Sequence, residues 1–328
     1  MLESFLTFSK EWKKAMRSIE KKYVKNYIPS VNGTIKKDFN LSRLTWFKVG
    51  GRAEVFFTPK DKDDLINFLK KLDKDAPLKI LGAGSNILVR DGGIRGVTIS
   101  LVKSFTEISY LKDQKVSAGA GVNCIKLSRE CISKSLTGLE FFSGIPGTVG
   151  GAIKMNAGAY GQETSDILEK VITVNRNGKV KEYNKKDLKM SYRKNSLRKD
   201  EIVIQAIFKC KIGKKITIQN NIKELKKRRE KTQPVKLKTS GSTFKNPIKF
   251  KAWKLIKLSG CSNLKKGGAE VSSLHSNFLI NYGVAKAKDV EDLGKIIIDK
   301  VKKKFGIKLD WEIKIVGTKN KYRKYFND

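Results

Sequence analysis

Two glycine-rich segments are the places where this backbone could hold a flat or phosphorylated ligand. Residues 143–161, SGIPGTVGGAIKMNAGAYG, contain six glycines. Glycine has no Cβ, so it adopts otherwise strained conformations and lets the main chain approach a ligand closely. A merely structural loop does not need this density beside Pro146, Thr148, Asn156 and Tyr160. The segment therefore indicates a binding loop.

The second candidate is Gly82-Ala83-Gly84-Ser85-Asn86, directly after the apolar stretch LKIL. At such a position the backbone amides either converge on an anion or form a tight β-turn, and both interpretations stay open. A dinucleotide fingerprint would need a third glycine, a following helix and a later acidic residue. Here the strand-like run ILV follows, which argues against a Rossmann fold and favours a turn between two strands.

The elements around these loops mix helices and strands. The spacing of Leu65, Phe68, Leu69 and Leu72 predicts a helix capped by Asp61. Strand, turn, strand, turn, strand is predicted for residues 78–101, and a hairpin with an Asn-Gly turn for KVITVNRNGKVKEYN.

Three further segments complete the chain. Cys124, Leu127 and Cys131 recur at helical spacing, so both thiols should face a core. Residues 216–232 predict a solvated basic helix, and an α/β region follows up to Gly317. Residues 1–40 predict a helix and a polar connector. The expected division is an N-terminal extension (1–40), a nucleotide-binding domain (41–213) and a substrate-binding domain (214–328).

Composition limits the class of protein. The four cysteines form no CxxC pair and have no histidine near them, which argues against a disulfide framework and against a zinc or other metal site. The N-terminal region has no apolar core run, and no stretch approaches the roughly 20 apolar residues of a spanning helix. We therefore expect a cytoplasmic protein that does not bind a membrane, and a monomer.

The formal net charge of +38 raises the question of nucleic acid. Only 12 of the 70 basic residues are arginine, and the lysines are spread along the whole chain, whereas nucleic-acid binders favour arginine and concentrate charge on one face. A polyanionic small substrate is the better expectation, and the charge would help to attract it.

Five motifs in order produce a specific resemblance: LGAGSNILV, the 143–161 segment, SYRKNSL (191–197), SGSTFKNP (240–247) and LDWEIKIVG (309–317). From about Leu41 to Gly317 the chain resembles the UDP-N-acetylenolpyruvoylglucosamine reductases, in the shorter form of that family. The resemblance implies an α+β fold, with a two-lobed FAD-binding domain of the vanillyl-alcohol oxidase (PCMH) type and a C-terminal α/β substrate domain. It also implies non-covalent FAD, NADPH as co-substrate and reduction of an enolpyruvyl UDP-sugar in peptidoglycan precursor synthesis.

Carried over by motif, the FAD-binding residues would be those of the two loops and of SAGAG: Gly82, Ala83, Gly84, Ser85, Asn86, Gly119, Gly144, Gly147, Thr148, Gly150, Gly151, Asn156 and Gly158. The catalytic residues would be Arg193, which suits a carboxylate, Ser242 as proton donor, and Glu312 near the developing enolate. Tyr192, Lys245, Asn246 and His275 would contact the substrate.

Two departures from the family pattern matter. Leu274 replaces a lysine expected before His275, which weakens a diphosphate role there, and Lys265 and Lys266 are the possible substitutes. The alternation from Trp311 to Val316 predicts a strand. Trp311 stands where a proline often precedes the glutamate, and a strand tolerates this change. The rival hypotheses are another FAD oxidoreductase of this fold, often with a histidine- or cysteine-tethered flavin, and a basic RNA- or DNA-binding module.

Overall fold

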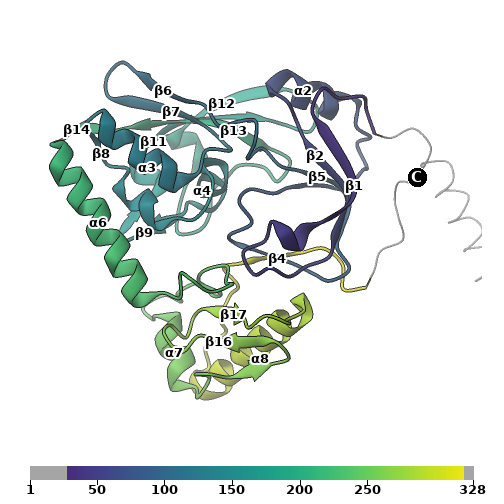
Figure 1. The fold of residues 1–328 in the computed structure, drawn as a ribbon, viewed down its shortest axis with the longest axis vertical. Coiled ribbons are helices and arrows are strands. Elements are labelled where there is room, and N and C mark those ends of the chain that lie inside the picture. The colour runs from purple at the N-terminus through teal and green to yellow at the C-terminus, as the bar shows by residue number, and fades with distance from the viewer. Residues whose placement is uncertain (1–27, 321–328) are drawn as a thin grey trace, which may run out of the picture.

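The computed structural model describes residues 28–320. Two lobes lie side by side and a smaller C-terminal part lies below them (Figure 1). One large core cluster is common to both lobes, since it contains Val55 and Phe68 of the first lobe together with Phe142 and Phe208 of the second. The N-terminal helix expected before residue 28 lies outside the described residues.

The first lobe is a four-stranded sheet in the order β1-β2-β5-β3, with β2, β5 and β3 parallel and β1 antiparallel. Helix α2 covers it and begins at Asp61, whose side chain accepts a hydrogen bond from the Asp64 amide at 2.9 Å, as predicted. The elements are β1 (Thr34–Asn40), η1 (Leu41–Arg43), β2 (Arg52–Thr58), α2 (Lys62–Lys71), β3 (Leu78–Ile80), β4 (Ile87–Val89) and β5 (Ile94–Ile99).

Strand β1 corrects the expected polar connector. Its sequence TIKKDFN lacks an alternating apolar pattern because it is an edge strand with mostly exposed side chains. It is nevertheless paired with β2 over its whole length, from Thr34 opposite Thr58 to Asn40 opposite Arg52.

The second lobe is a five-stranded antiparallel sheet in the order β12-β11-β13-β7-β6. Helix α3 buries Cys124, Leu127 and Cys131, and β11 and β12 form the predicted hairpin. The elements are β6 (Ile108–Leu111), β7 (Lys115–Gly119), α3 (Cys124–Ser133), β8 (Leu136–Thr137), η2 (Glu140–Gly144), α4 (Val149–Met155), β9 (Gly158–Ala159), β10 (Gln162–Glu163), α5 (Thr164–Ile167), β11 (Leu168–Val174), β12 (Val180–Asn184), η3 (Lys185–Leu188), β13 (Ile202–Lys209) and β14 (Lys211–Ile212).

The glycine-dense segment 143–161 is therefore not a continuous loop. Residues Val149–Met155 form α4, in which Ala152 and Ile153 are buried, and Asn156 ends the helix with a left-handed φ of 42°. Two glycines in its first turn concealed the helix, because glycine is a poor helix former.

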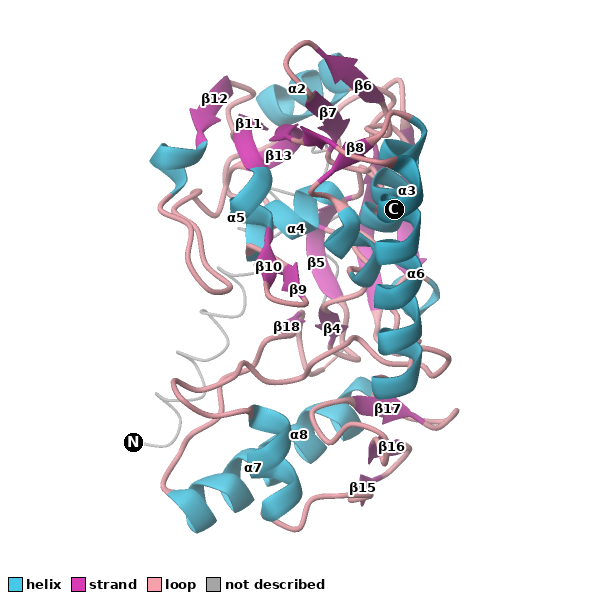
Figure 2. Cartoon of the chain, turned by 90° about the vertical axis from the view of Figure 1, so that its left-hand side faces the viewer, coloured by secondary structure: helices cyan, strands magenta, loops and turns pink. Residues whose placement is uncertain are grey.

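The basic helix α6 (Lys215–Thr232) runs along the outside of the second lobe and leads to the C-terminal part (Figure 2). There a three-stranded sheet, β15-β16-β17, packs with α7 and α8. The remaining elements are α7 (Ala252–Leu258), β15 (Lys265–Lys266), β16 (Ala269–Val271), β17 (Leu279–Asn281), α8 (Ala287–Phe305) and β18 (Lys314–Val316). The strand expected over 311–316 is thus shorter, and β18 pairs with β4 of the first lobe in parallel.

Specific polar contacts dock the C-terminal part on the first lobe. Arg90 Nε donates to Glu291 Oε2 on α8 at 2.8 Å, and Asp91 accepts from the first amides of α8. Asn281 donates to the Phe47 carbonyl at 2.8 Å. Between residues 28 and 320 no helix has the length and apolarity to cross a membrane.

Candidate active site

A cavity of about 1980 Å³ lies where the two lobes and the C-terminal part meet. A pocket for one drug-sized ligand has ~300–1,000 Å³, so this cavity has room for a dinucleotide and a second ligand. Among residues 28–320, its lining includes 11 lysines and arginines and only three acids, Asp200, Glu201 and Glu312. The cavity is therefore suited to anionic ligands.

The Gly82–Asn86 loop offers unused donors to this cavity. All five residues line it, and none of their backbone N–H groups has a hydrogen-bond partner within the described part of the chain. Their carbonyls are engaged instead, since Gly84 O accepts from Trp46 N and Asn86 O from Lys314 N, both at 3.0 Å. Consecutive free amides form a concave site for an anion, so the loop is more than a tight turn.

Gly84 has a steric reason to be glycine. Its φ is +69°, and a Cβ there would lie 2.3 Å from the Leu44 carbonyl oxygen. Strand β4 follows the loop, which confirms that the segment is not a Rossmann fingerprint.

The second segment lines the cavity in a different way. Around the start of α4 the amides are already used: Val149 N donates to Val122 O, Gly150 N to Ala120 O and Gly151 N to the Thr148 hydroxyl. Around Gly147, Gly150 and Gly151 the segment therefore contributes a wall formed mainly by backbone. At Gly147, which lines the cavity, the nearest atom to an added Cβ would be Ser85 Oγ at 3.6 Å.

Several buried polar atoms near the cavity lack partners inside the protein. Thr98 Oγ1, Thr239 Oγ1 and Arg176 Nε have no hydrogen bond to any described residue, and all three residues line the cavity. A buried polar group without a partner costs roughly 1–3 kcal/mol. Together with the free amides, these orphaned groups fit a polar dinucleotide such as FAD.

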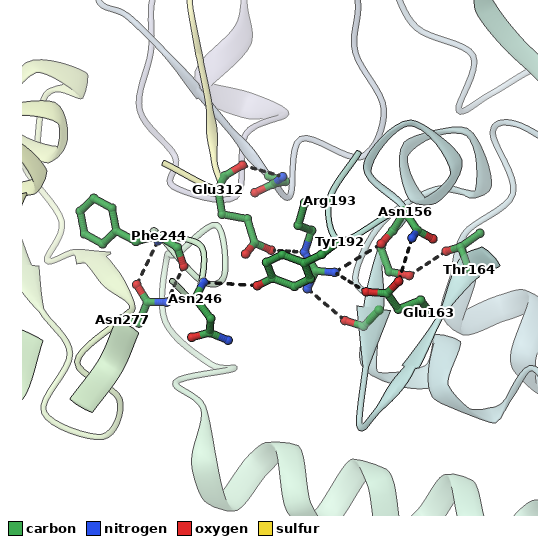
Figure 3. A network of polar contacts seen from close by, with 12 residues as sticks. Asn156, Glu163, Thr164, Tyr192, Arg193, Phe244, Asn246, Asn277 and Glu312 are labelled. Carbon is green, nitrogen blue, oxygen red and sulfur yellow. Dashed lines mark hydrogen bonds and ion pairs between the residues drawn. The ribbon is translucent and has the colours of Figure 1, made fainter. Parts of the chain in front are cut away.

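Arg193 and Glu312 meet on one wall of the cavity, although they lie 119 residues apart. Arg193 Nε donates to Glu312 Oε1 at 2.8 Å, and both side chains are 14 % exposed (Figure 3). The other guanidinium nitrogens donate to the carbonyls of Asn156 at 3.3 Å and Gly158 at 3.4 Å. The guanidinium also lies over the Tyr192 ring, 4.7 Å from its centre.

Ser242 is joined to this pair through the backbone of its neighbour. The Glu312 amide donates to the Thr243 carbonyl at 2.8 Å, and Ser242 forms a bridge to Phe278. Ser242, Arg193 and Glu312 all line the cavity. The three predicted catalytic residues, from three distant segments, therefore share one wall.

Asn86 connects the phosphate-type loop to the same wall. Its side-chain amide donates to the Glu312 carbonyl at 3.3 Å, so this residue positions the glutamate backbone. Its backbone amide, in contrast, has no acceptor among the described residues.

The predicted substrate-binding residues are divided between the cavity and its margin. His275 lines the cavity, its Nδ1 accepts from Asn277 N at 3.2 Å, and burial lowers its pKa. Tyr192 and Asn246 contact each other at 3.3 Å, and burial raises the pKa of Tyr192, with Glu312 adding to the effect. Neither of them nor Lys245 belongs to the cavity lining.

Two predicted cofactor residues also lie off the cavity. Gly119 belongs to β7, where a Cβ would lie 2.4 Å from the Phe105 carbonyl oxygen, so close packing alone accounts for a glycine there. Asn156 is fully buried, and its side chain bonds to Glu163, Ser191 and Ser165 while its carbonyl holds Arg193. The predicted residues that line the cavity are Gly82, Ala83, Gly84, Ser85, Asn86, Gly144, Gly147, Thr148, Gly150, Gly151, Gly158, Arg193, Ser242, His275 and Glu312.

Sequence reasoning missed part of the lining, namely Trp46, Thr98, Arg176, Arg228, Arg229, Thr239, Trp253, Lys257 and Lys314. The sequence did contain a signal for two of them. Arg228 and Arg229 are adjacent near the C-terminal end of α6, which was expected to be a solvated helix, and both line the cavity. Lys265 and Lys266, the suggested substitutes for a diphosphate contact, lie off the cavity, and Lys265 pairs with Glu270 at 3.6 Å.

Comparisons with known proteins identify the two halves of this site. Residues 53–184 match the model of an FAD binding domain, and residues 233–316 match the C-terminal domain of UDP-N-acetylenolpyruvoylglucosamine reductase. The reductase of Orientia tsutsugamushi (strain Boryong) is 46% identical over 296 residues, which are 89% of this chain and 98% of that protein. The chain belongs to the UDP-N-acetylenolpyruvoylglucosamine reductase family.

Other relatives of this family agree. The reductase of Rickettsia bellii (strain RML369-C) is 44% identical over 88% of this chain and 96% of its own. The crystal structure of the Thermus caldophilus reductase (MurB) aligns with a TM-score of 0.74 at 33% identity, and covers 87% of this chain and 99% of that one. The predicted two-lobed α+β fold is thus confirmed, and this member of the reductase family is an oxidoreductase with an FAD cofactor.

Proposed function

We propose that the chain reduces the enolpyruvyl group of UDP-N-acetylglucosamine enolpyruvate to give UDP-N-acetylmuramate, with NADPH as the reductant. Membership of the family makes it a reductase of peptidoglycan precursor synthesis. The meeting of Arg193, Ser242 and Glu312 on one wall of a cationic cavity carries the more detailed proposal. The proposal includes a cytoplasmic location and a monomeric state.

FAD would be held by the free amides of residues 82–86 against the side-chain-poor wall of residues 144–158. When bound, FAD supplies hydride transfer between the nicotinamide and the substrate double bond. We propose that it is held without a covalent bond, because the cavity lining contains no cysteine and its histidine lies in the C-terminal part. We propose two functional domains, an FAD-binding domain that ends at about residue 213 and a substrate-binding domain over 214–328. Because β1 belongs to the sheet of the first lobe, the first domain begins at Thr34 and not at the expected residue 41.

Arg193 would bind the substrate carboxylate while it positions Glu312. A guanidinium has five N–H donors, of which three are directed at Glu312, Asn156 and Gly158. Two donors remain for a carboxylate oxygen. The residue can therefore orient the substrate without releasing the glutamate.

Ser242 would deliver the proton that completes the reduction. Addition of hydride to C3 of the enolpyruvyl group makes C2 strongly basic, so even a weakly acidic hydroxyl can protonate it. The Ser242 side chain forms no hydrogen bond to a described residue, so no protein acceptor competes for its proton. Glu312, held beside it through the Thr243 carbonyl, would polarise the reacting end of the substrate.

A direct test combines flavin analysis with turnover by the full chain. We expect a yellow protein that releases free FAD on acid denaturation. Beyond the single equivalent that reduces the bound flavin, it should turn over NADPH rapidly only when the enolpyruvyl UDP-sugar is present. Flavin that stays with the precipitated protein would favour a tethered sugar or alcohol oxidase. A colourless protein that binds RNA or DNA would favour the nucleic-acid module.

A further inference from the structure

An exposed aromatic ring lies at the edge of the cavity on the C-terminal part. Trp253, in the first turn of α7, lines the cavity and is 41% exposed. It is the outer member of a row of rings: its centre is 6.3 Å from that of His275, which is 4.7 Å from that of Phe278. The row leads from the buried Phe278 to the exposed Trp253.

Packing of α7 does not account for this tryptophan. The helix buries Ala252, Leu255 and Ile256 against the C-terminal core, and Trp253 belongs to none of the core clusters in the described chain. A large ring beside a cavity, with much of its surface in water, gains most when a ligand covers it.

The surroundings of Trp253 fit a base that carries a phosphate. Leu274, which is 51% exposed, provides a second apolar surface on the cavity lining. Lys257 lies four residues further along α7, on the same helix face as Trp253, and also lines the cavity. Ser262 and Ser273, both exposed on the lining, can hydrogen-bond the polar edge of a planar ring.

We propose that Trp253 is the stacking face of a nucleobase subsite, with Leu274 beside it and Lys257 on its phosphate side. The assignment rests on the proposed function, and its ligand is the uracil ring of the UDP-sugar. Ser242 pairs with Phe278, whose ring contacts His275, and His275 in turn lies beside Trp253. A substrate that reacts near Ser242 can therefore reach Trp253 with its nucleotide end. The adenine of NADPH has the same stacking chemistry, so the test includes it.

The first measurement is the steady-state kinetics of the holoenzyme. Removal of a stacked ring costs ~1–3 kcal/mol per base, so Trp253→Ala should raise KM for the UDP-sugar by about tenfold. We expect kcat to change by less than about twofold, because the ring binds the substrate remote from the reacting carbons. Trp253→Phe, which keeps a ring, should recover most of the affinity.

The matched control is Leu258→Ala. Leu258 is 50% exposed on the same helix but does not line the cavity, so this variant should keep the wild-type KM. If Trp253→Ala loses flavin or unfolds, Trp253→Leu takes its place, because it keeps apolar bulk without a ring. A wild-type KM in a folded Trp253→Leu variant would overturn the proposal.

Binding of UDP and of 2′,5′-ADP to the flavin-loaded protein, measured by calorimetry, separates the two possible bases. Weaker binding of UDP alone in Trp253→Ala supports the uracil assignment. Weaker binding of 2′,5′-ADP alone, or unchanged binding of both, overturns it. Failure of the wild-type enzyme to turn over the UDP-sugar would instead reject the proposed function, and is seen before any variant is made.

Discussion

The guanidinium of Arg193 donates to three oxygens, those of Glu312 and of the Asn156 and Gly158 carbonyls, and forms a longer ion pair of 4.0 Å with Glu163. Its own backbone has a left-handed φ of 57° in the turn between Ser191 and Lys194. A solvated surface arginine needs neither feature. The structure therefore favours a positioning role for Arg193 in addition to binding a carboxylate.

Replacing Arg193 by lysine tests this interpretation. Lysine keeps the positive charge, but one ammonium cannot reach Glu312 and both carbonyls in the planar arrangement of a guanidinium. We expect kcat/KM for the UDP-sugar to fall by about 10²-fold, the scale of losing one positioned donor, while NADPH still reduces the flavin. Arg198→Lys is the control, since Arg198 is 76% exposed and pairs with Asp200 in the same loop. A fully active Arg193→Lys variant would show that Arg193 has no such role.

Ser242 should matter only in the second half-reaction. Reduction of the flavin by NADPH needs no proton at the substrate C2, so Ser242→Ala should carry it out at a near-normal rate. Reoxidation by the enolpyruvyl substrate should slow by at least about 10²-fold, as for loss of a positioned proton donor. Ser242→Cys should retain part of the activity, because a thiol can also donate.

Stopped-flow absorbance of the flavin separates the outcomes for Ser242→Ala. If Ser242 is only a turn residue, both half-reactions survive. If it supports the cofactor, flavin content falls and both fail together. Intact reoxidation in a flavin-loaded variant would remove Ser242 from the mechanism.

At the scale of elements, the helices and strands that could be predicted are those whose signals come from residues close together in the sequence. The Asp61 cap and the apolar spacing of α2 depend on neighbouring residues, and so does the Asn-Gly turn of the β11–β12 hairpin. Strand β1 depends on its partner β2, and α4 on burial of Ala152 and Ile153, so neither has a local pattern strong enough to reveal it.

The same distinction applies to the site. Arg193, Ser242 and Glu312 were found through motifs, because periodicity cannot bring together residues more than a hundred positions apart. Arg176 and Trp253 were missed, since each sits in an unremarkable element and reaches the cavity only through tertiary packing. Asn156 and Gly119 share the motifs of the cavity-lining residues but lie off the cavity, because a motif does not separate contact from support.

The glycine wall can be tested at Gly147. A Cβ there would meet no protein atom closer than 3.6 Å, so Gly147→Ala should fold normally. It should bind FAD more weakly, because the added carbon projects from a cavity-lining position against the cofactor. Flavin content after gel filtration measures the loss, and thermal unfolding of the flavin-stripped variant provides the control for the fold. Full flavin content would show that the ligand does not touch this wall.

Gly84→Val should fail in a different way. Its left-handed φ and the 2.3 Å approach to the Leu44 carbonyl mean that the loop itself cannot accept a side chain. Both flavin content and the stability of the flavin-stripped protein should therefore fall. The contrast between the two glycines distinguishes crowding of the ligand from damage to the fold.

The Arg90–Glu291 pair, which docks α8 on the first lobe, should make stability depend on pH. The hydrogen bond from Arg90 holds the pKa of Glu291 below its ordinary 4.5, against the opposing effect of burial. A carboxyl with a lowered folded-state pKa stabilises the fold at pH values above 4.5 and loses that contribution as the pH falls below it. When the pH is lowered from about 7 to about 4, the free energy of unfolding should therefore decrease less in Glu291→Gln than in the wild type.

Urea unfolding at the two pH values measures this difference. Glu224→Gln is the control, because Glu224 is 73% exposed and pairs only with Lys227 among the described residues. An equal pH dependence in Glu291→Gln and in the wild type would show that the docking pair does not couple to folding.

At the scale of the whole molecule, the cavity differs from the rest of the chain in having few acids among its described lining residues. Among the described residues, eleven lysines and arginines and three acids line the cavity. Arg228 and Arg229, near the C-terminal end of α6, are two of these basic residues. Burial lowers the pKa of Arg229, as expected for a cation that lacks a carboxylate partner in the described chain. Such a cavity focuses the field on anions that approach it.

Turnover at limiting substrate should therefore depend strongly on salt. The screening length falls from about 30 Å at 0.01 M salt to about 10 Å at 0.1 M, so attraction from outside the cavity is largely removed. We expect kcat/KM for the UDP-sugar to fall by about tenfold between 0.01 M and 0.1 M salt. The value of kcat at saturating substrate should stay nearly constant, because steering changes the rate of encounter and not the rate of the chemical step. Steady-state kinetics over a NaCl series measures both, and a titration with RNA or DNA at physiological salt tests the competing use of the charge. Sequence-selective binding of RNA or DNA at physiological salt would contradict steering, and so would a kcat/KM that does not change with NaCl. Either result would mean that the positive charge has a use other than the capture of a small anionic substrate.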